Sequence, residues 1–226
     1  MSSRSPILRP PQARYLETLL PRRDAIRAEM ERFAAEQGVP IAHPALGRLL
    51  EALAGARPAG RCLEVGTAIG YGTLCLARGA RQGKVVSIDR DASRQETARR
   101  FLASAGALER VELLTGEALE LLPRLEAPFD LVYIDGDKRD YRRCLDGALP
   151  LVTLGGFVVV DNLLWKGTIA DPARRDEDDA AAREIERFNF YFMIHPQLVA
   201  NLLPFGDGVG LAVKKQPTIR ELGGPY

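Results

Sequence analysis

The segment Arg61–Gly72 constrains the fold of this chain more than any other. It reads Arg-Cys-Leu-Glu-Val-Gly-Thr-Ala-Ile-Gly-Tyr-Gly, which is an apolar strand, a glycine-rich turn and the start of a helix. The strand carries an acid, Glu64, one residue before its end. This order is typical of the first βα turn of a doubly wound α/β domain, where the turn faces a nucleotide-like ligand.

A second apolar strand, Lys84–Asp89, also ends in an acid. A carboxylate at that place can accept hydrogen bonds from both hydroxyl groups of a ribose. The turn glycines, Gly66, Gly70 and Gly72, have the spacing G-x-x-x-G-x-G, whereas dinucleotide binders have G-x-G-x-x-G. We therefore expect S-adenosylmethionine (SAM) rather than NAD as the ligand.

Strands and helices alternate along the middle of the chain. Five apolar strands are centred on Leu63, Val85, Val111, Leu131 and Val158. Helical patterns at 71–78, 92–105, 118–125 and 141–151 separate them, and another is expected at 184–194. Such alternation indicates right-handed βαβ units and a parallel sheet. Two short strands, 200–204 and 209–214, flank a glycine-containing turn and predict a hairpin whose last strand is antiparallel, at or near the sheet edge.

The predicted fold class is therefore α/β. We expect a Rossmann-like, doubly wound, seven-stranded and mostly parallel sheet, with a C-terminal antiparallel β-hairpin and helices on both faces. With 226 residues, the chain suits a single domain. We place that domain at 14–215, after a flexible N-terminal arm (1–13) and before a C-terminal tail (216–226). Its first part has helical patterns at 13–37, interrupted at Pro21, and at 44–56.

Composition limits the class of partner. The chain has 31 basic and 30 acidic side chains, and a balanced charge gives no reason to expect nucleic acid or a membrane surface as partner. No apolar run is long enough for a membrane span, and the N-terminus lacks the apolar core of a signal peptide. Cys62, Cys75 and Cys144 form no C-x-x-C pair. We expect free buried thiols and a cytoplasmic, reducing location.

Polar residues follow the fourth and fifth strands. Asp135 ends one of them, and Asp161 and Asn162 end the next. In a parallel sheet these ends lie at the same edge as the Gly66 turn, so the three side chains should converge beside the ligand. Oxygen donors without His or Cys suit Mg²⁺ best, with Ca²⁺ or Mn²⁺ as alternatives.

Lys138 lies three residues beyond Asp135. Because like charge disfavours protonation of a lysine, Lys138 beside such an ion would be able to accept a proton from a phenol. The resulting phenolate is the nucleophile that a sulfonium methyl group requires.

At this point the chain resembles the cation-dependent class I O-methyltransferases, which include catechol O-methyltransferase, plant caffeoyl-CoA O-methyltransferase and bacterial small-molecule relatives. The resemblance runs from about residue 15 to 215. The motifs that carry it are Leu63–Thr67 with Gly70-Tyr71, Ile88-Asp89, Ile134–Tyr141, Gly155-Gly156 with Asp161–Trp165, and Leu203-Pro204 with Gly206–Gly208.

The resemblance implies a role for each matching residue. The metal ligands would be Asp135, Asp161 and Asn162, and the catalytic residues would be Lys138, as the base, and Asp135. Around the cofactor would lie Ala42, Glu64, Gly66, Thr67, Tyr71, Gly72, Asp89, Ala118 and Asp135. The substrate would meet Lys138, Trp165 and Asn189. A homodimer is also implied, with the N-terminal helices covering the cofactor or supporting dimerisation.

Three positions depart from the family pattern. Gly72 replaces a serine that hydrogen-bonds the cofactor, Glu117 replaces an aspartate, and Gly136 replaces an alanine. Loss of the serine would weaken cofactor binding by roughly 0.5–1.5 kcal/mol, the net worth of a neutral hydrogen bond.

Structural interpretations stand beside these roles. The less favoured interpretations make Glu64 an acceptor for the glycine turn, Asp89 the N-cap of the next helix, and Asp161–Asn162 an ordinary Asx turn. Trp165 suits either the core or a lid over the substrate. The aromatic residues of 188–192 favour the core or a dimer interface over the substrate pocket.

The expected function is SAM-dependent, metal-dependent methylation of one hydroxyl of a vicinal-dihydroxy aromatic small molecule. Two alternatives stay open. One is an O-methyltransferase that acts on a non-catechol natural-product hydroxyl. The other is a non-catalytic SAM-binding module.

Overall fold

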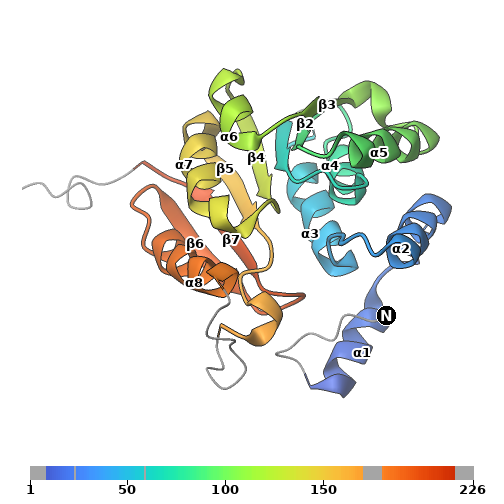
Figure 1. Ribbon diagram of the computed structural model, residues 1–226, viewed down its shortest axis with the longest axis horizontal. Helices are drawn as coiled ribbons and strands as arrows, with labels where there is room; N and C mark the ends of the chain where they lie inside the picture. The colour runs from blue at the N-terminus through green and yellow to red at the C-terminus, as the bar shows by residue number, and fades with distance from the viewer. Residues whose placement is uncertain (1–8, 23, 59, 170–179, 217–226) are drawn as a thin grey trace, which may run out of the picture.

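The computed structural model describes residues 9–22, 24–58, 60–169 and 180–216. Figure 1 shows the arrangement of the helices and strands. The α-helices are α1 (Pro10–Leu19), α2 (Ala25–Gln37), α3 (Pro44–Gly55), α4 (Tyr71–Gly79), α5 (Ala92–Ser104), α6 (Ala118–Leu121), α7 (Tyr141–Ala148) and α8 (Ala180–Met193). The strands are β1 (Arg61–Val65), β2 (Lys84–Asp89), β3 (Val111–Thr115), β4 (Phe129–Ile134), β5 (Val152–Val160), β6 (Leu198–Leu203) and β7 (Val209–Lys214).

The described strands form one sheet in the order β3-β2-β1-β4-β5-β7-β6. The first five strands in this order are parallel, and β7 runs antiparallel to both β5 and β6. The predicted fold is therefore confirmed, and β7 lies one strand in from the edge that β6 forms. The strand order reverses between β1 and β4, which is where ligands bind in open sheets of this kind.

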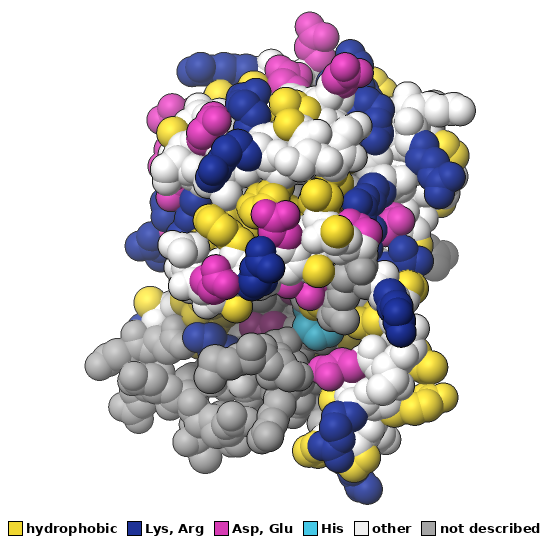
Figure 2. All heavy atoms as spheres, turned by 90° about the vertical axis from the view of Figure 1, so that its right-hand side faces the viewer, with side chains coloured by type: hydrophobic (Ala, Val, Ile, Leu, Met, Phe, Trp, Pro, Cys, Tyr) yellow, Lys and Arg dark blue, Asp and Glu magenta, His cyan; other side chains and the backbone are white. Residues whose placement is uncertain are grey.

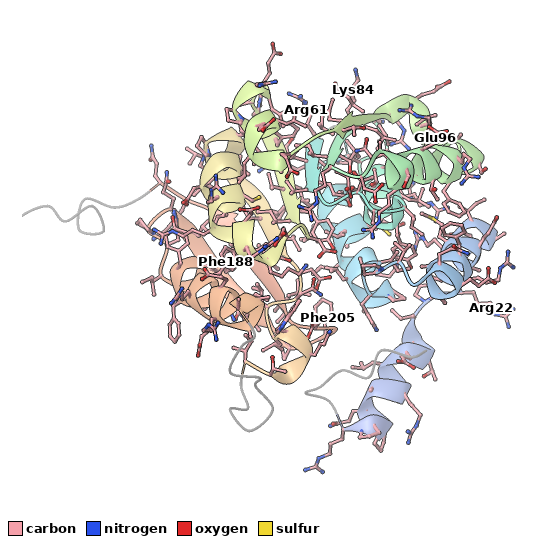
Figure 3. The ribbon with its side chains drawn as sticks, viewed as in Figure 1. Arg22, Arg61, Lys84, Glu96, Phe188 and Phe205 are labelled. Atoms are coloured by element: carbon pink, nitrogen blue, oxygen red, sulfur yellow. The ribbon has the colours of Figure 1, made fainter. Side chains whose placement is uncertain are left out.

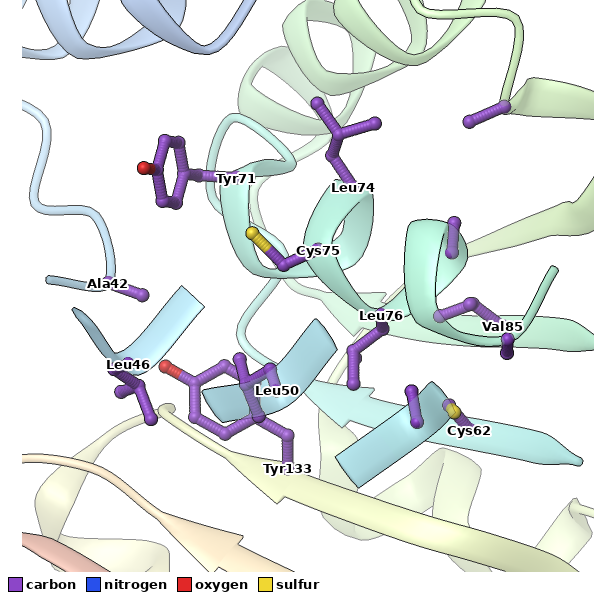
Figure 4. Close-up of a cluster of buried hydrophobic side chains, with 14 of the residues drawn as sticks. Ala42, Leu46, Leu50, Cys62, Tyr71, Leu74, Cys75, Leu76, Val85 and Tyr133 are labelled. Carbon is purple, nitrogen blue, oxygen red and sulfur yellow. The ribbon is translucent and has the colours of Figure 1, made fainter. Parts of the chain in front are cut away.

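Alternate residues of each central strand face opposite sides of the sheet. Cys62 and Leu131 join one core with α2–α5, whereas Leu63 and Val132 join a second core with α7 and α8. Figure 4 shows part of the first core, where side chains from α3, α4 and the sheet meet. Because both faces are covered, the sheet is held rigidly and its strand ends are fixed relative to one another.

The N-terminal part departs from the expected arm. α1 begins at Pro10, so residues 10–13 are helical. Proline is favoured at the first helical position, because its missing N–H has no helical acceptor there. None of the side chains of α1 is buried. The expected break falls between Leu19 and Ala25, and Gly38 ends α2 in the left-handed conformation.

Two predicted helices are shorter than expected and end in 3-10 turns. The segment 118–125 is α6 followed by a turn at Leu122–Arg124, and the segment 141–151 is α7 followed by a turn at Leu149–Leu151. Each turn contains a proline, Pro123 or Pro150, which cannot donate the helical hydrogen bond and so ends the α-helix.

None of the helices in the described ranges combines the length and the apolar character needed to cross a bilayer. Figure 2 shows acidic and basic side chains interspersed over one face, in keeping with the balanced composition. Figure 3 shows Arg61 and Lys84, at the start of β1 and β2, at the opposite end of the strands from Phe205 in the β6–β7 turn. That turn therefore lies at the edge of the sheet where the parallel strands end.

Candidate functional site

The carboxyl ends of the parallel strands surround a cavity of about 480 Å³. The predicted site residues in its wall are Gly66, Asp89, Ala118, Asp135, Lys138, Asp161, Asn162 and Trp165. A smaller hollow beside it shares Gly66 and Asp135 with the cavity. The further predicted residues in the hollow are Ala42, Glu64, Thr67, Tyr71 and Gly72. The fold thus brings together all the predicted site residues except Asn189.

The glycine turn is joined to the strands on either side of β1. The Gly66 N–H donates to the Ile88 carbonyl at 2.8 Å, and the Asp135 N–H donates to the Val65 carbonyl at 2.8 Å. Gly66 has φ +104°, and a Cβ there would overlap the Asp135 backbone carbonyl. Only glycine suits this position, because other residues adopt such a φ poorly and this one also has no room for a side chain.

Glu64 is 1 % exposed, and its carboxyl lies beside Gly72 at the start of α4. Its Oε2 accepts hydrogen bonds from the hydroxyls of Thr73 and, at 2.5 Å, Ser87. Burial raises the pKa of Glu64 to about 8. Its Oε1 has no hydrogen-bond partner among the described residues. A buried acceptor without a donor is costly, so this carboxyl fits a positively charged ligand group placed in the hollow.

A buried polar network continues from Glu64 through the hydroxyl of Ser87. The hydroxyls of Thr67 and Ser87 lie 2.6 Å apart, and the Gln95 side chain donates to the Leu114 carbonyl at 2.9 Å. The Thr115 hydroxyl in turn donates to Gln95 at 2.6 Å. Sequence reasoning missed this network. The available signal was Ser87, a polar residue in the otherwise apolar β2.

Asp89 holds its carboxylate at the cavity edge through two backbone donors. The Ala68 N–H donates to Oδ2 at 2.8 Å, and the Asp91 N–H donates to Oδ1 at 2.9 Å. The N-cap of α5 is Asp91 and not Asp89. Because Asp89 is free of the capping role, the remaining lone pairs of its carboxylate are available to a ligand in the cavity.

The second acidic cluster lies at the ends of β4 and β5. Lys138 Nζ donates to Asp135 Oδ1 at 2.9 Å and to the Gly136 carbonyl at 3.2 Å. Asp161 is 5 % exposed, and the Asn162 N–H donates to its Oδ1 at 2.7 Å. Burial, and secondly the charge of Asp135, raise the pKa of Asp161. The charge of Lys138 opposes this effect, and a cation placed between the two carboxylates would be stabilised by them in the same way.

No group of three His, Cys, Asp or Glu side chains is placed to hold a metal within the described ranges. The candidate set instead combines two carboxylates with the amide of Asn162. Oxygen donors of this kind suit Mg²⁺ or Ca²⁺, whose remaining positions are commonly filled by water or substrate. The donor chemistry therefore fits a hard divalent cation.

The segment after β5 has an unusual backbone. Asn162, Trp165 and Lys166 have φ values of 62°, 44° and 56°. Trp165 lines the cavity and also packs against the second core, so its position suits both interpretations that the sequence left open. Asp207, from the β6–β7 turn, lines the same part of the cavity. Burial raises the pKa of Asp207, and hydrogen bonds from Lys166 and Asn162 oppose this effect.

Two predicted residues make contacts that the sequence did not indicate. The Tyr71 hydroxyl donates to Glu31 of α2 at 2.8 Å, so Tyr71 joins that helix to the small hollow. Asn189 is absent from the cavity wall. Its amide donates to the Leu163 carbonyl at 2.7 Å, which holds it behind the segment that follows β5.

Phe188 and Phe192 are buried in the core, as favoured, but Phe190 is exposed.

The comparison with known families decides the identity. The model of the O-methyltransferase family matches residues 23–215, which is most of the chain and includes every predicted site residue. The chain belongs to the O-methyltransferase family. The resemblance stated from the motifs and the assignment as an O-methyltransferase are thereby confirmed.

Relatives of this O-methyltransferase include two proteins named catechol O-methyltransferase. The one from Niastella koreensis is 30 % identical, and the match covers 89 % of this chain and 95 % of that protein. The one from Mycobacterium tuberculosis is 44 % identical, over 60 % of this chain and 62 % of that protein. The solved O-methyltransferase TomG from Streptomyces achromogenes, involved in tomaymycin synthesis and in complex with SAM, is 34 % identical. The match covers 89 % of this chain and 95 % of the TomG chain, with a TM-score of 0.79.

Several cavity residues of this O-methyltransferase were not predicted. Pro40 and Ile41 line both the cavity and the hollow, and Arg94 and Leu119 line the cavity. The first two precede α3 and carry no polar chemistry that a sequence pattern would reveal. Asp207 belonged to a recognised motif, but sequence reasoning assigned it only to a turn.

Proposed function

We propose that this O-methyltransferase methylates one hydroxyl of a vicinal-dihydroxy aromatic small molecule, with SAM as methyl donor and a divalent cation, Mg²⁺ foremost and Ca²⁺ or Mn²⁺ as alternatives. The observation that carries the proposal is the cluster at the ends of β4 and β5. There Lys138 lies 2.9 Å from Asp135, beside the buried Asp161 and Asn162 in the wall of one cavity. The names of the two catechol O-methyltransferase relatives support the same acceptor class.

The cation would be held by Asp135, Asp161 and Asn162, and when bound it would supply positive charge that favours the ionised hydroxyl. Lys138 is mostly buried, with its side chain 15 % exposed, and its Nζ contacts the Asp135 carboxylate. We assign to Lys138 Nζ the role of accepting the hydroxyl proton. SAM, when bound, would supply the methyl group, with its sulfur leaving as a neutral thioether, while Lys138 keeps the hydroxyl proton.

The cofactor residues of this chain act by orientation. Glu64 offers its free Oε1 to the positively charged amino-acid end of SAM, and Asp89 presents a fixed carboxylate to the ribose hydroxyls. Ala118 lines the cavity, and we assign it to the adenine. Holding donor and acceptor in line accounts for a large share of the rate enhancement in transfers of this kind.

Location and assembly are part of the proposal. The three cysteines are buried and free, which supports a reducing compartment such as the cytoplasm. Exposed apolar side chains on α1, namely Tyr15, Leu16 and Leu19, support a homodimer in which α1 contributes contacts. Light scattering coupled to size exclusion tests the dimer, and a monomer at micromolar concentration would contradict it.

Methyl transfer from labelled SAM to a panel of catechols, with Mg²⁺ or with a chelator, tests the main proposal. We expect transfer to caffeic acid, caffeoyl-CoA or a flavonoid with adjacent hydroxyls, and loss of transfer with the chelator. Matched phenols with one hydroxyl serve as controls. Equal rates on these phenols would favour a non-catechol natural-product acceptor. Binding of SAM without any transfer would favour a non-catalytic module.

A further inference from the structure

The β6–β7 turn packs against the segment that follows β5, although Lys166 and Asp207 are 41 residues apart. The Lys166 N–H donates to Asp207 Oδ1 at 2.5 Å. The Leu164 N–H donates to the Asp207 backbone carbonyl at 2.8 Å. Asp207 therefore contacts this segment through both its side chain and its backbone.

The segment held by these contacts, residues 162–166, has an unfavourable backbone conformation. Asn162, Trp165 and Lys166 all adopt left-handed backbone, with φ between 44° and 62°. Residues with a Cβ disfavour this region, so such a shape persists only where surrounding contacts impose it. The β6–β7 turn also packs closely against the segment, and a Cβ at Gly208 would overlap the Leu164 side chain.

Asp207 also interacts with the side chain of Asn162. A side-chain hydrogen bond from Asn162 is among the contributions that lower the pKa of Asp207 against the effect of burial. A carboxylate only accepts, so this interaction uses the NH₂ group of Asn162. Asn162 has a single carbonyl oxygen, which is thereby left for the cavity that both residues line together with Asp161.

We propose that Asp207 is the positioning residue for the acceptor side of the cavity. It holds the 162–166 segment in its left-handed shape, so that Asn162 turns its carbonyl oxygen toward the cation position and Trp165 lies against the cavity. The part that concerns the cation rests on the proposed function, whereas the part that concerns the shape of the segment does not. Partners outside the first ligand shell commonly orient metal ligands in this manner.

Fluorescence tests the shape of the segment, because Trp165 is the only tryptophan of the chain. Asp207→Asn keeps the size of the side chain but replaces one acceptor oxygen by a donor, and Asp207→Ala removes both oxygens. We expect a shifted emission maximum and at least twofold stronger acrylamide quenching in both variants. Asp146→Asn, which alters an exposed carboxylate on α7, is the matched control and should match the wild type.

Binding of Mn²⁺ alone, followed by electron paramagnetic resonance, tests the orientation of Asn162. We expect Asp207→Asn to weaken Mn²⁺ binding about 10–100-fold, the usual effect of losing such a partner. Asp161→Ala is the reference variant that loses the site. Gly208→Ala pushes the turn away while keeping the carboxylate, and it should change Trp165 quenching in the same direction. Circular dichroism confirms that each variant is folded.

The outcomes separate the two proposals. Wild-type Trp165 fluorescence in folded Asp207→Ala would overturn the positioning role. Unchanged Mn²⁺ affinity in Asp207→Asn, with loss in Asp161→Ala, would overturn the orientation of Asn162. If the wild type and Asp161→Ala bind Mn²⁺ equally poorly, the cation in the proposed function is refuted, and the fluorescence result alone decides the role of Asp207.

Discussion

The buried Glu64 makes the affinity for SAM depend on pH. Burial raises the pKa of Glu64 to about 8, so at pH 7 the carboxyl is roughly nine-tenths protonated in the ligand-free protein. A positively charged ligand group beside Oε1 favours the ionised form. Binding at pH 7 must therefore include ionisation of Glu64, which costs about 1.4 kcal/mol for one pKa unit.

The dissociation constant of SAM should fall about tenfold per pH unit as the pH rises from 6 toward 8, and then level off. Titration calorimetry measures this constant, and at pH 7 it should also detect release of close to one proton in buffers of different ionisation enthalpy. Glu64→Gln should abolish the rise in affinity and the proton release. Glu112→Gln, which alters an exposed glutamate on β3, should behave as the wild type.

The same group affects stability in the opposite sense. The pKa of Glu64 is higher in the folded chain than its usual value of 4.5. The stability it contributes is therefore full below about pH 4.5 and declines as the pH rises toward 8. The melting temperature without ligand should decline over this range in the wild type more than in Glu64→Gln.

A SAM affinity that does not change between pH 6 and 8 would refute the reasoning, because it would show that Glu64 keeps its protonation state on binding.

Three further variants follow from the site. Asp161→Ala should abolish methyl transfer but leave SAM affinity within a few-fold by calorimetry, and wild-type turnover would remove the metal mechanism. Lys138→Ala should lower the rate and move its pH profile toward higher pH, because solvent hydroxide must then take the proton; an unchanged profile would assign the proton to another group. Gly72→Ser should weaken SAM binding, because a Cβ there would overlap Glu64 Oε1 and displace this carboxyl, and the overpacking should also lower folding stability by about 1–3 kcal/mol. Tighter binding would mean that Glu64 moves aside and the serine gains the hydrogen bond.

The sequence predicted the core of the fold because its signals are local. Apolar runs that end in Glu64-Val65, Asp89 and Asp135 define strands, and helical periods between them require a parallel sheet. A parallel sheet aligns the ends of its strands, so the convergence of Asp135, Asp161 and Asn162 followed from topology alone. The ends of two helices were predicted too late in the chain, although Pro123 and Pro150 are visible in the sequence and end α6 and α7 by removing single hydrogen bonds.

Tertiary structure decided which polar groups meet across the fold. The free Oε1 of Glu64 depends on where Thr73 and Ser87 lie, and these come from α4 and β2. Asn189 is held behind the cavity by the Leu163 carbonyl, which no spacing in the sequence reveals.

The sequence by itself determined the α/β fold, the family, and the set of acids and the lysine at one sheet edge. Only the tertiary structure decided that Asp207 contacts Lys166 and that Asn162, Trp165 and Lys166 are held in left-handed backbone. The physical reason is that periodicity and turn residues report on neighbours along the chain. Hydrogen bonds between distant segments depend instead on the packing of the whole sheet and its helices.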